Sequence, residues 1–202
     1  MTHQNTKKSD QIAELLAAGI VRGEIPPGEK LRQDQIAQDF QSSHVPVREA
    51  LLRLVAQGLA ISLPRRGVCV APFDKSSVRE LIVMRKALEP VALMNSVLNL
   101  TRAQIESAEE ARLGCDDANS AQEWEEANRD FHLAIVSGCG MPRLVEEISN
   151  LQMLYARHFL AQFSDQWQKR ADKDHQAILT AIYARDTDGA VEILRRHLAK
   201  LR

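Results

Sequence analysis

The sequence predicts a mainly α-helical protein, with an N-terminal domain of three helices and a β-hairpin and a C-terminal antiparallel helical bundle. A chain of 202 residues is long enough for two small domains. Aromatic residues make up only 4% of it, and Leu, Ala, Ile and Val supply most of the 45% hydrophobic content. This balance favours helices packed on helices over a β-sandwich. Beyond residue 74 the apolar residues recur only at helical spacing.

Composition also narrows the classes of function. No apolar run approaches the ~20 residues of a membrane span, and the polar segment Met1–Asp10 lacks a signal-peptide core. The cysteines Cys69, Cys115 and Cys139 form no CxxC pair, which is typical of reduced thiols, so we expect a cytoplasmic protein with no membrane partner. Residues 1–70 carry nine Lys and Arg against seven Asp and Glu, and the remainder carries seventeen against twenty. A slightly basic segment over residues 1–70, followed by an acidic one, is typical of a protein whose N-terminal part binds nucleic acid.

Periodic apolar residues predict three helices in the first sixty residues. Ser9 is the expected N-cap of the first helix, and Gly23 ends it. Pro46 suits the first turn of the third, where its missing N–H costs little. The predicted helices cover Ser9–Arg22, Gln33–Phe40 and Pro46 to about Gln57.

Two short strands are expected after these helices, at residues 60–63 and 68–70, joined by the basic turn Pro64–Gly67. Three helices followed by a basic hairpin are typical of a winged helix-turn-helix. Ala71–Asp74 has little periodicity and contains a proline, so we place the domain boundary there. The expected domains are residues 1–71 and residues 72–202.

The helices of the second domain are marked by their ends. A helix begins soon after the boundary, and Pro90 should kink or split it. Thr101 and Ser120 each precede a Gln or Glu by three residues, the pattern of a capping box. The remaining predicted helices cover Pro142 to about Phe163, Asp165–Arg185 and Asp188–Arg202.

Polar side chains gather where the third helix begins. Ser43, His44 and Arg48 lie at and just after its N-terminus, the part of a helix-turn-helix that meets base edges and phosphates. Arg48 can bind guanine bidentately or a phosphate. An ordinary amphipathic helix with an exposed arginine has the same pattern, so this segment alone leaves DNA binding and a plain surface helix open.

Residues 9–71 resemble GntR-type transcriptional regulators, and the rest resembles the all-helical FCD effector domain of the FadR branch. This resemblance implies a regulator, most often a repressor released by a metabolite, that binds an inverted-repeat operator as a homodimer. The residues that carry it are Gly23–Leu31, Ile36-Ala37, Pro46–Leu51, Gly58-Leu59, Arg65–Gly67, Arg85–Pro90, Phe131-His132, His175 and His197.

One segment departs from the family pattern. The family usually has Ser-Arg-Thr before Pro-Val-Arg, whereas this chain has Ser43-His44-Val45. A neutral His and a Val cannot replace a charged Arg and a hydroxyl, so the family's usual half-site is not expected. The expected DNA-binding residues are Arg32, Ser43, His44, Val45, Pro46, Arg48, Arg65, Arg66 and Gly67.

Three histidines are spaced so that they can converge. Asn128 and His132 are four residues apart and share one helix face. His175 and His197 each lie about eleven residues, or ~16 Å, from a turn near Asp186, so an antiparallel pair brings both imidazoles to one level. Three imidazoles in a bundle suit a divalent transition metal, Zn²⁺ foremost, with Ni²⁺ or Mn²⁺ also open. Each histidine could equally be a satisfied core side chain.

The resemblance adds specific roles. It implies that Asn128, His132, His175 and His197 hold the metal, with Asn128 standing where many members have Asp. A neutral amide oxygen is a weaker ligand than a carboxylate. It also places Arg85 near the effector cavity, where pairing with a ligand carboxylate would make the effector a small organic acid. An ion pair between Arg85 and Glu89, one turn on, is the competing interpretation.

Two other classes of function compete with a metabolite-responsive regulator. Three histidines with an open coordination position could activate water in a metal-dependent enzyme, although the HExxH glutamate of hydrolytic zinc sites is missing. A constitutive architectural DNA-binding protein could use the metal only to hold its fold. We expect a regulator and not an enzyme.

Overall fold

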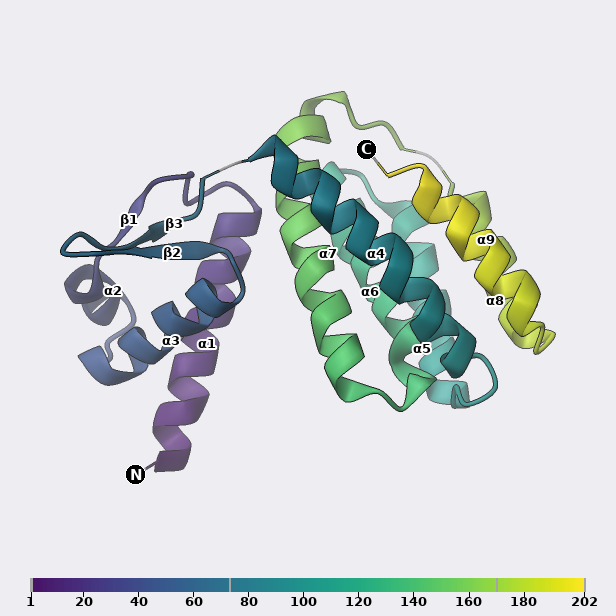
Figure 1. Cartoon of the computed structure of the whole chain (residues 1–202), viewed down its shortest axis with the longest axis horizontal. Helices are drawn as coiled ribbons and strands as arrows, with labels where there is room; N and C mark the ends of the chain where they lie inside the picture. The colour runs from purple at the N-terminus through teal and green to yellow at the C-terminus, as the bar shows by residue number, and fades with distance from the viewer. Residues whose placement is uncertain (1, 73, 170, 202) are drawn as a thin grey trace. The chain divides into compact units, whose positions relative to one another are not determined.

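The computed structural model describes residues 2–72, 74–169 and 171–201 of the chain. It divides into two compact units, Met1–Asp74 and Lys75–Arg202 (Figure 1). The first contains a helix-turn-helix and a small sheet, and the regular secondary structure of the second is helical within the described residues. The mainly α fold class is therefore confirmed.

The N-terminal unit packs three helices beside a three-stranded antiparallel sheet of order β1-β3-β2. The long first helix lies against the third, and apolar side chains of both are fully buried, Ile12 and Leu54 among them. The elements of this unit are α1 (Thr2–Val21), β1 (Lys30–Leu31), α2 (Gln33–Asp39), α3 (His44–Ala56), β2 (Ala60–Leu63) and β3 (Gly67–Val70).

Two features of this unit differ from the prediction. Helix α1 begins at Thr2, so the N-cap assigned to Ser9 is wrong. Ser9 is fully buried on the same face as Ile12 and Leu16, and tertiary packing of this face overrides the local preference of serine for a cap. Strand β1 was not predicted because two residues are too short to show alternation; Leu31 pairs with Val68 of β3.

The basic turn between β2 and β3 contains a strained residue. The Arg66 N–H donates to the Leu63 carbonyl at 3.1 Å, which closes a tight turn. Arg65 inside this turn has φ of 62°, the left-handed region that glycine adopts most readily. An arginine there costs backbone energy and places a long cation at the tip of the hairpin.

The predicted caps of the C-terminal unit are largely confirmed. Thr101 and Gln104 form both hydrogen bonds of a capping box. Ser120 accepts from the Glu123 N–H, whereas the Glu123 carboxylate accepts from the Asn119 N–H rather than from the cap itself. The helices are α4 (Lys75–Ser96), α5 (Arg102–Asp117), α6 (Ala121–Val136), α7 (Pro142–Phe163), α8 (Lys173–Tyr183) and α9 (Thr187–Ala199).

Two helices run differently from the prediction. Helix α4 continues through Pro90, so the proline does not split it. The start predicted at Asp165 is wrong, because α8 begins only at Lys173, where the Asp172 carboxylate accepts from the N–H groups of Asp174 and His175. Arg170 and Arg202, which belong to the two predicted closing helices, lie outside the described residues.

The helices of this unit enclose a large apolar core, and a smaller cluster forms around Cys115 and Trp124. Phe131, Ile135, Ile148, Ile178 and Leu194 are fully buried, and they come from α6, α7, α8 and α9. Each helix thus contributes a stripe of apolar residues, as the helical spacing predicted. None of the helices within the described residues is long and apolar enough to cross a bilayer.

The capping box gives a prediction about stability. Thr101→Ala removes one half of it, so the free energy of unfolding should fall by about 1 kcal/mol. Thr180 is an exposed threonine inside α8, and Thr180→Ala should leave stability nearly unchanged. Urea denaturation followed by tryptophan fluorescence measures this, since both tryptophans lie beyond residue 100. Equal destabilisation by the two substitutions would contradict the role of the cap.

Candidate metal centre and nucleic-acid interface

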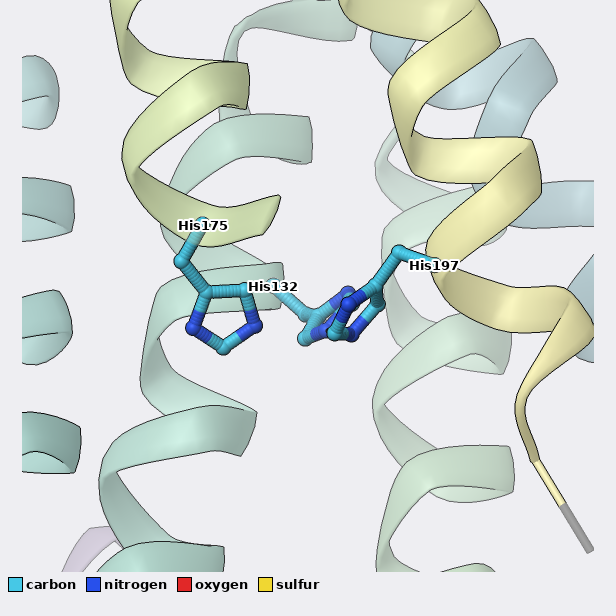
Figure 2. Close-up of side chains that lie close together, drawn as sticks. All are labelled: His132, His175 and His197. Carbon is cyan, nitrogen blue, oxygen red and sulfur yellow. The ribbon is translucent and has the colours of Figure 1, made fainter. Parts of the chain in front are cut away.

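Helices α6, α8 and α9 bring three histidines together inside the bundle. His132 and His175 are buried, and the side chain of His197 is 11% exposed. The ring centroids lie 5.4 Å apart for His132 and His175, 5.2 Å for His132 and His197, and 4.8 Å for His175 and His197. Figure 2 shows the three side chains reaching from separate helices into one space. One ring nitrogen from each lies within 4.8 Å of the others, so the predicted convergence is present.

Carboxylates orient two of the three rings. His132 Nδ1 is 2.8 Å from Glu89 Oε2, and His197 Nδ1 is 3.3 Å from Asp174 Oδ2. A ring nitrogen that faces an ionised carboxylate carries the proton, which leaves the Nε2 lone pair of each ring for another partner. These two Nε2 atoms face each other at 3.3 Å. Two nitrogen lone pairs at this distance repel each other, so a proton or a cation is needed between them.

His175 adds the observation that bears most directly on a metal. Both of its ring nitrogens are buried, and neither has a hydrogen-bond partner among the described residues. The ring stacks on Phe131 with centroids 4.1 Å apart, and the Asp172 carboxylate is 3.6 Å away. Burying unpaired polar nitrogens is costly, and a metal ion would satisfy one of the two. The donor set therefore fits a divalent transition ion.

The electrostatics of the cluster favour neutral imidazoles. Burial, followed by the nearby His132, lowers the pKa of His175 well below its ordinary value. The same causes lower the pKa of His197 to about 4, although Asp172 and Asp174 oppose them. Neutral imidazole is the form that coordinates a metal, so neutral pH already provides it for these two side chains.

Asn128 lies one turn before His132 on α6, as its spacing predicted. Its Oδ1 atom is buried and has no hydrogen-bond partner in the described part of the chain. An unpaired amide oxygen beside a nitrogen cluster is compatible with the ligand role that the resemblance implied.

Arg85 is 3% exposed and already has a carboxylate partner. Its Nε donates to Glu89 Oε1 at 2.6 Å, and its guanidinium lies 5.1 Å from the centroid of the Tyr155 ring. Burial alone would raise the pKa of Glu89, but Arg85 and His132 together hold it well below its usual range. The ion pair that competed with effector binding is therefore present.

Sequence reasoning missed several polar groups of this region. Gln152 on α7 is 2% exposed, and neither atom of its amide has a hydrogen-bond partner among the described residues. A polar residue on the same helix face as Ile148 and Tyr155 was the available signal. The contact of Glu89 with His132 and the carboxylates of Asp172 and Asp174 left no such signal, because they depend on how the helices pack.

The expected DNA-binding residues lie mostly on the surface of the N-terminal unit. Ser43 is the N-cap of α3, and its side chain makes no capping hydrogen bond. The hydroxyl therefore remains available to a ligand at a helix N-terminus, which favours phosphate. The residues exposed as expected are Arg32, Ser43, His44, Val45, Arg48, Arg65, Arg66 and Gly67.

Pro46 is the exception. It is buried in the first turn of α3, beside the buried Val47. Its ring has no N–H to satisfy and packs inward, and its expected contact with DNA stays a prediction. Pro46 instead helps to set the direction in which α3 begins.

Comparisons with known proteins agree with this architecture. Residues 8–70 match the model of the bacterial regulatory proteins of the gntR family, and residues 80–200 match that of the FCD domain. The chain is 32% identical to the "Uncharacterized HTH-type transcriptional regulator BphR" of Paraburkholderia xenovorans (strain LB400), covering 91% of this chain and 79% of the relative. It is 30% identical to the HTH-type transcriptional repressor GlaR of Escherichia coli (strain K12), covering 89% and 87%.

A solved structure, E. coli McbR/YncC, superimposes with a TM-score of 0.79 at 26% identity, covering 96% of this chain and 94% of that one. The two curated relatives are named as a transcriptional regulator and a transcriptional repressor, which agrees with the regulator expected from the sequence. The chain belongs to the GntR family of bacterial regulatory proteins, and it is a transcriptional regulator whose FCD domain follows an operator-binding winged helix.

Proposed function

We propose that this regulator is a repressor that binds an inverted-repeat operator as a homodimer and is released by a small organic acid bound beside a metal ion. The observation that carries the proposal is the buried cluster of His132, His175 and His197, in which the His175 nitrogens have no partner among the described residues. The likeness to GlaR, a transcriptional repressor, supports the direction of control.

The metal site proposed here uses His132, His175 and His197, with the Asn128 amide oxygen as a fourth donor. Three imidazoles with an amide oxygen suit Zn²⁺, and Ni²⁺ or Mn²⁺ would also accept this set. When bound, the metal supplies a positive centre that attracts an anionic oxygen. The bundle already keeps two of these imidazoles neutral, which lowers the cost of binding the ion.

Arg85 and Gln152 are the proposed effector-binding side chains of this chain. Arg85 uses its Nε for Glu89, and a guanidinium has further N–H donors that suit a carboxylate. The Gln152 amide, buried and without a partner in the described part of the chain, can donate to or accept from a polar group on the same effector. An effector that satisfies these atoms repays the cost of burying them.

A stripe on α4 supports the homodimer. Exposed apolar residues recur every three or four positions: Val83, Ala87, Val91 and Met94 on α4, and Leu98 in the turn that follows it. A continuous apolar stripe on one helix face is typical of an interface between subunits. Two copies joined in this way would present two recognition helices to the two halves of an inverted repeat. Release then requires a change in the spacing of those helices.

Loss of the metal is expected when its ligands are removed. Protein purified without chelator should contain about one divalent ion per chain by elemental analysis. His175→Ala or His197→Ala should remove it and lower the melting temperature, because an ion held only by the folded state stabilises that state. His158→Ala, on α7, is the control and should retain the ion. Full occupancy in a variant that lacks His132, His175 and His197 would reject the site.

Two arginines should contribute differently to DNA binding. Arg48→Ala should cost about 1–3 kcal/mol of binding free energy on an operator selected from random DNA, and far less on scrambled DNA, if Arg48 reads a base.

Arg65→Gly should weaken binding to both DNAs similarly and reduce its salt dependence, since it removes a phosphate-contacting cation. The same change relieves the left-handed strain at φ of 62°, so the folded state should not lose stability. Titrations at several salt concentrations measure both effects, and unchanged binding by Arg48→Ala would refute base reading.

Release by an effector is tested with a screen of carboxylate metabolites by thermal shift, followed by operator titration with each hit. A true effector should weaken operator binding, and operator DNA should weaken effector binding by the same factor. Arg85→Lys, which keeps the charge that Glu89 needs, should reduce effector affinity because the planar fork is lost. Acids that bind at the metal without changing operator affinity would make the metal structural and the protein a constitutive DNA-binding protein.

A further inference from the structure

Three buried side chains form a line from α4 to the histidine cluster. Arg85 Nε is 2.6 Å from Glu89 Oε1, and Glu89 Oε2 is 2.8 Å from His132 Nδ1. Glu89 is fully buried, and its two partners are 3% and 1% exposed. Each oxygen of one carboxylate thus has a separate partner, one of which is a histidine of the cluster.

An i,i+4 ion pair between Arg85 and Glu89 does not require such burial. Pairs of this spacing form readily on a helix surface, where neither charge has to leave water. Burying a carboxylate is costly unless its oxygens are well paired, and breaking such a pair is strongly destabilising. The position of Glu89 is explained by what its second oxygen does, which is to accept the Nδ1–H of His132.

We propose that Glu89 is the positioning residue of the metal site: it keeps the proton of His132 on Nδ1 and holds the ring so that Nε2 faces His175 and His197. This inference rests on the proposed metal function of the cluster. It also connects Arg85, a proposed effector-binding residue, to a proposed metal ligand through a single carboxylate. A change in how Arg85 is engaged therefore reaches the metal through Glu89.

Asp174 offers an internal comparison. It faces His197 Nδ1 at 3.3 Å, a longer contact than that of Glu89 with His132. Its carboxylate is also contacted by Lys200 and by Arg196, and its side chain is 10% exposed. The Asp174 carboxylate is therefore shared among several cations, whereas the Glu89 carboxylate is shared between Arg85 and His132 within the described part of the chain. Glu89 should contribute more to metal affinity than Asp174.

The test compares three amide variants of the full chain loaded with Co²⁺ or Zn²⁺. Glu89→Gln keeps the shape of the side chain but removes the charge, and it should weaken metal affinity by roughly 10–100-fold in a chelator competition. It should also change the visible absorption of bound Co²⁺, which a purely structural role would not do. Asp174→Asn should have a smaller effect. Glu125→Gln, a buried carboxylate on α6 paired with Arg129, should leave affinity unchanged.

Each outcome has a definite meaning. Wild-type protein that binds no metal overturns the proposed metal function and this inference with it. Wild-type protein that binds metal while Glu89→Gln binds it with the same affinity and spectrum overturns the inference alone. If Glu89→Gln does not fold, ¹⁵N NMR of the metal-free wild-type protein decides, since the inference requires His132 to carry its proton on Nδ1. A proton on Nε2 of His132 would refute it.

Discussion

The C-terminal domain depends on enclosing polar groups inside an apolar core. Three imidazoles, a carboxylate and a guanidinium lie among side chains such as Phe131 and Ile178 that are fully buried. A buried polar group costs free energy unless it is paired, so the packing of these helices has to bring Arg85, Glu89 and His132 together. Helices α4, α6, α8 and α9 meet at this centre. The packing of these helices therefore has to pair the buried polar groups as well as bury apolar surface.

The fold was predictable wherever a local signal agreed with tertiary packing. Thr101 marks a helix start because its hydroxyl can cap it, and Pro142 does so because it has no N–H that needs a partner. Helices α5 and α7 begin at these positions as predicted. Ser9 and Asp165 carry comparable local signals but failed as helix starts. Ser9 lies on a buried face within α1, and Asp165 lies in a short 3-10 helix, whereas the Asp172 carboxylate caps α8. Local preference alone does not distinguish such cases.

Some features of the candidate site could be predicted from the sequence, and others could not. The equal distances of His175 and His197 from one turn are written in the sequence, so their meeting could be predicted from helix geometry alone. Glu89 lies 43 residues before His132, and no spacing rule relates positions on separate helices. The same holds for Gln152, whose lack of partners is visible only once its surroundings are known. The two histidines that flank one turn could be predicted from the sequence, whereas the carboxylates that face the cluster could not.

The short strand β1 has a mechanical consequence for the hairpin beside α3. Because β1 pairs with β3 and β3 pairs with β2, the segment that leads into α2 is hydrogen-bonded to the hairpin itself. These hydrogen bonds fix the hairpin to the segment that enters α2, so the hairpin does not move independently of the helices. The tip of the hairpin and the N-terminus of α3 should therefore move together as one rigid unit. On the inverted repeat proposed above, each such rigid unit would contact its own half-site, so sequence changes would be tolerated more readily between the half-sites than within them.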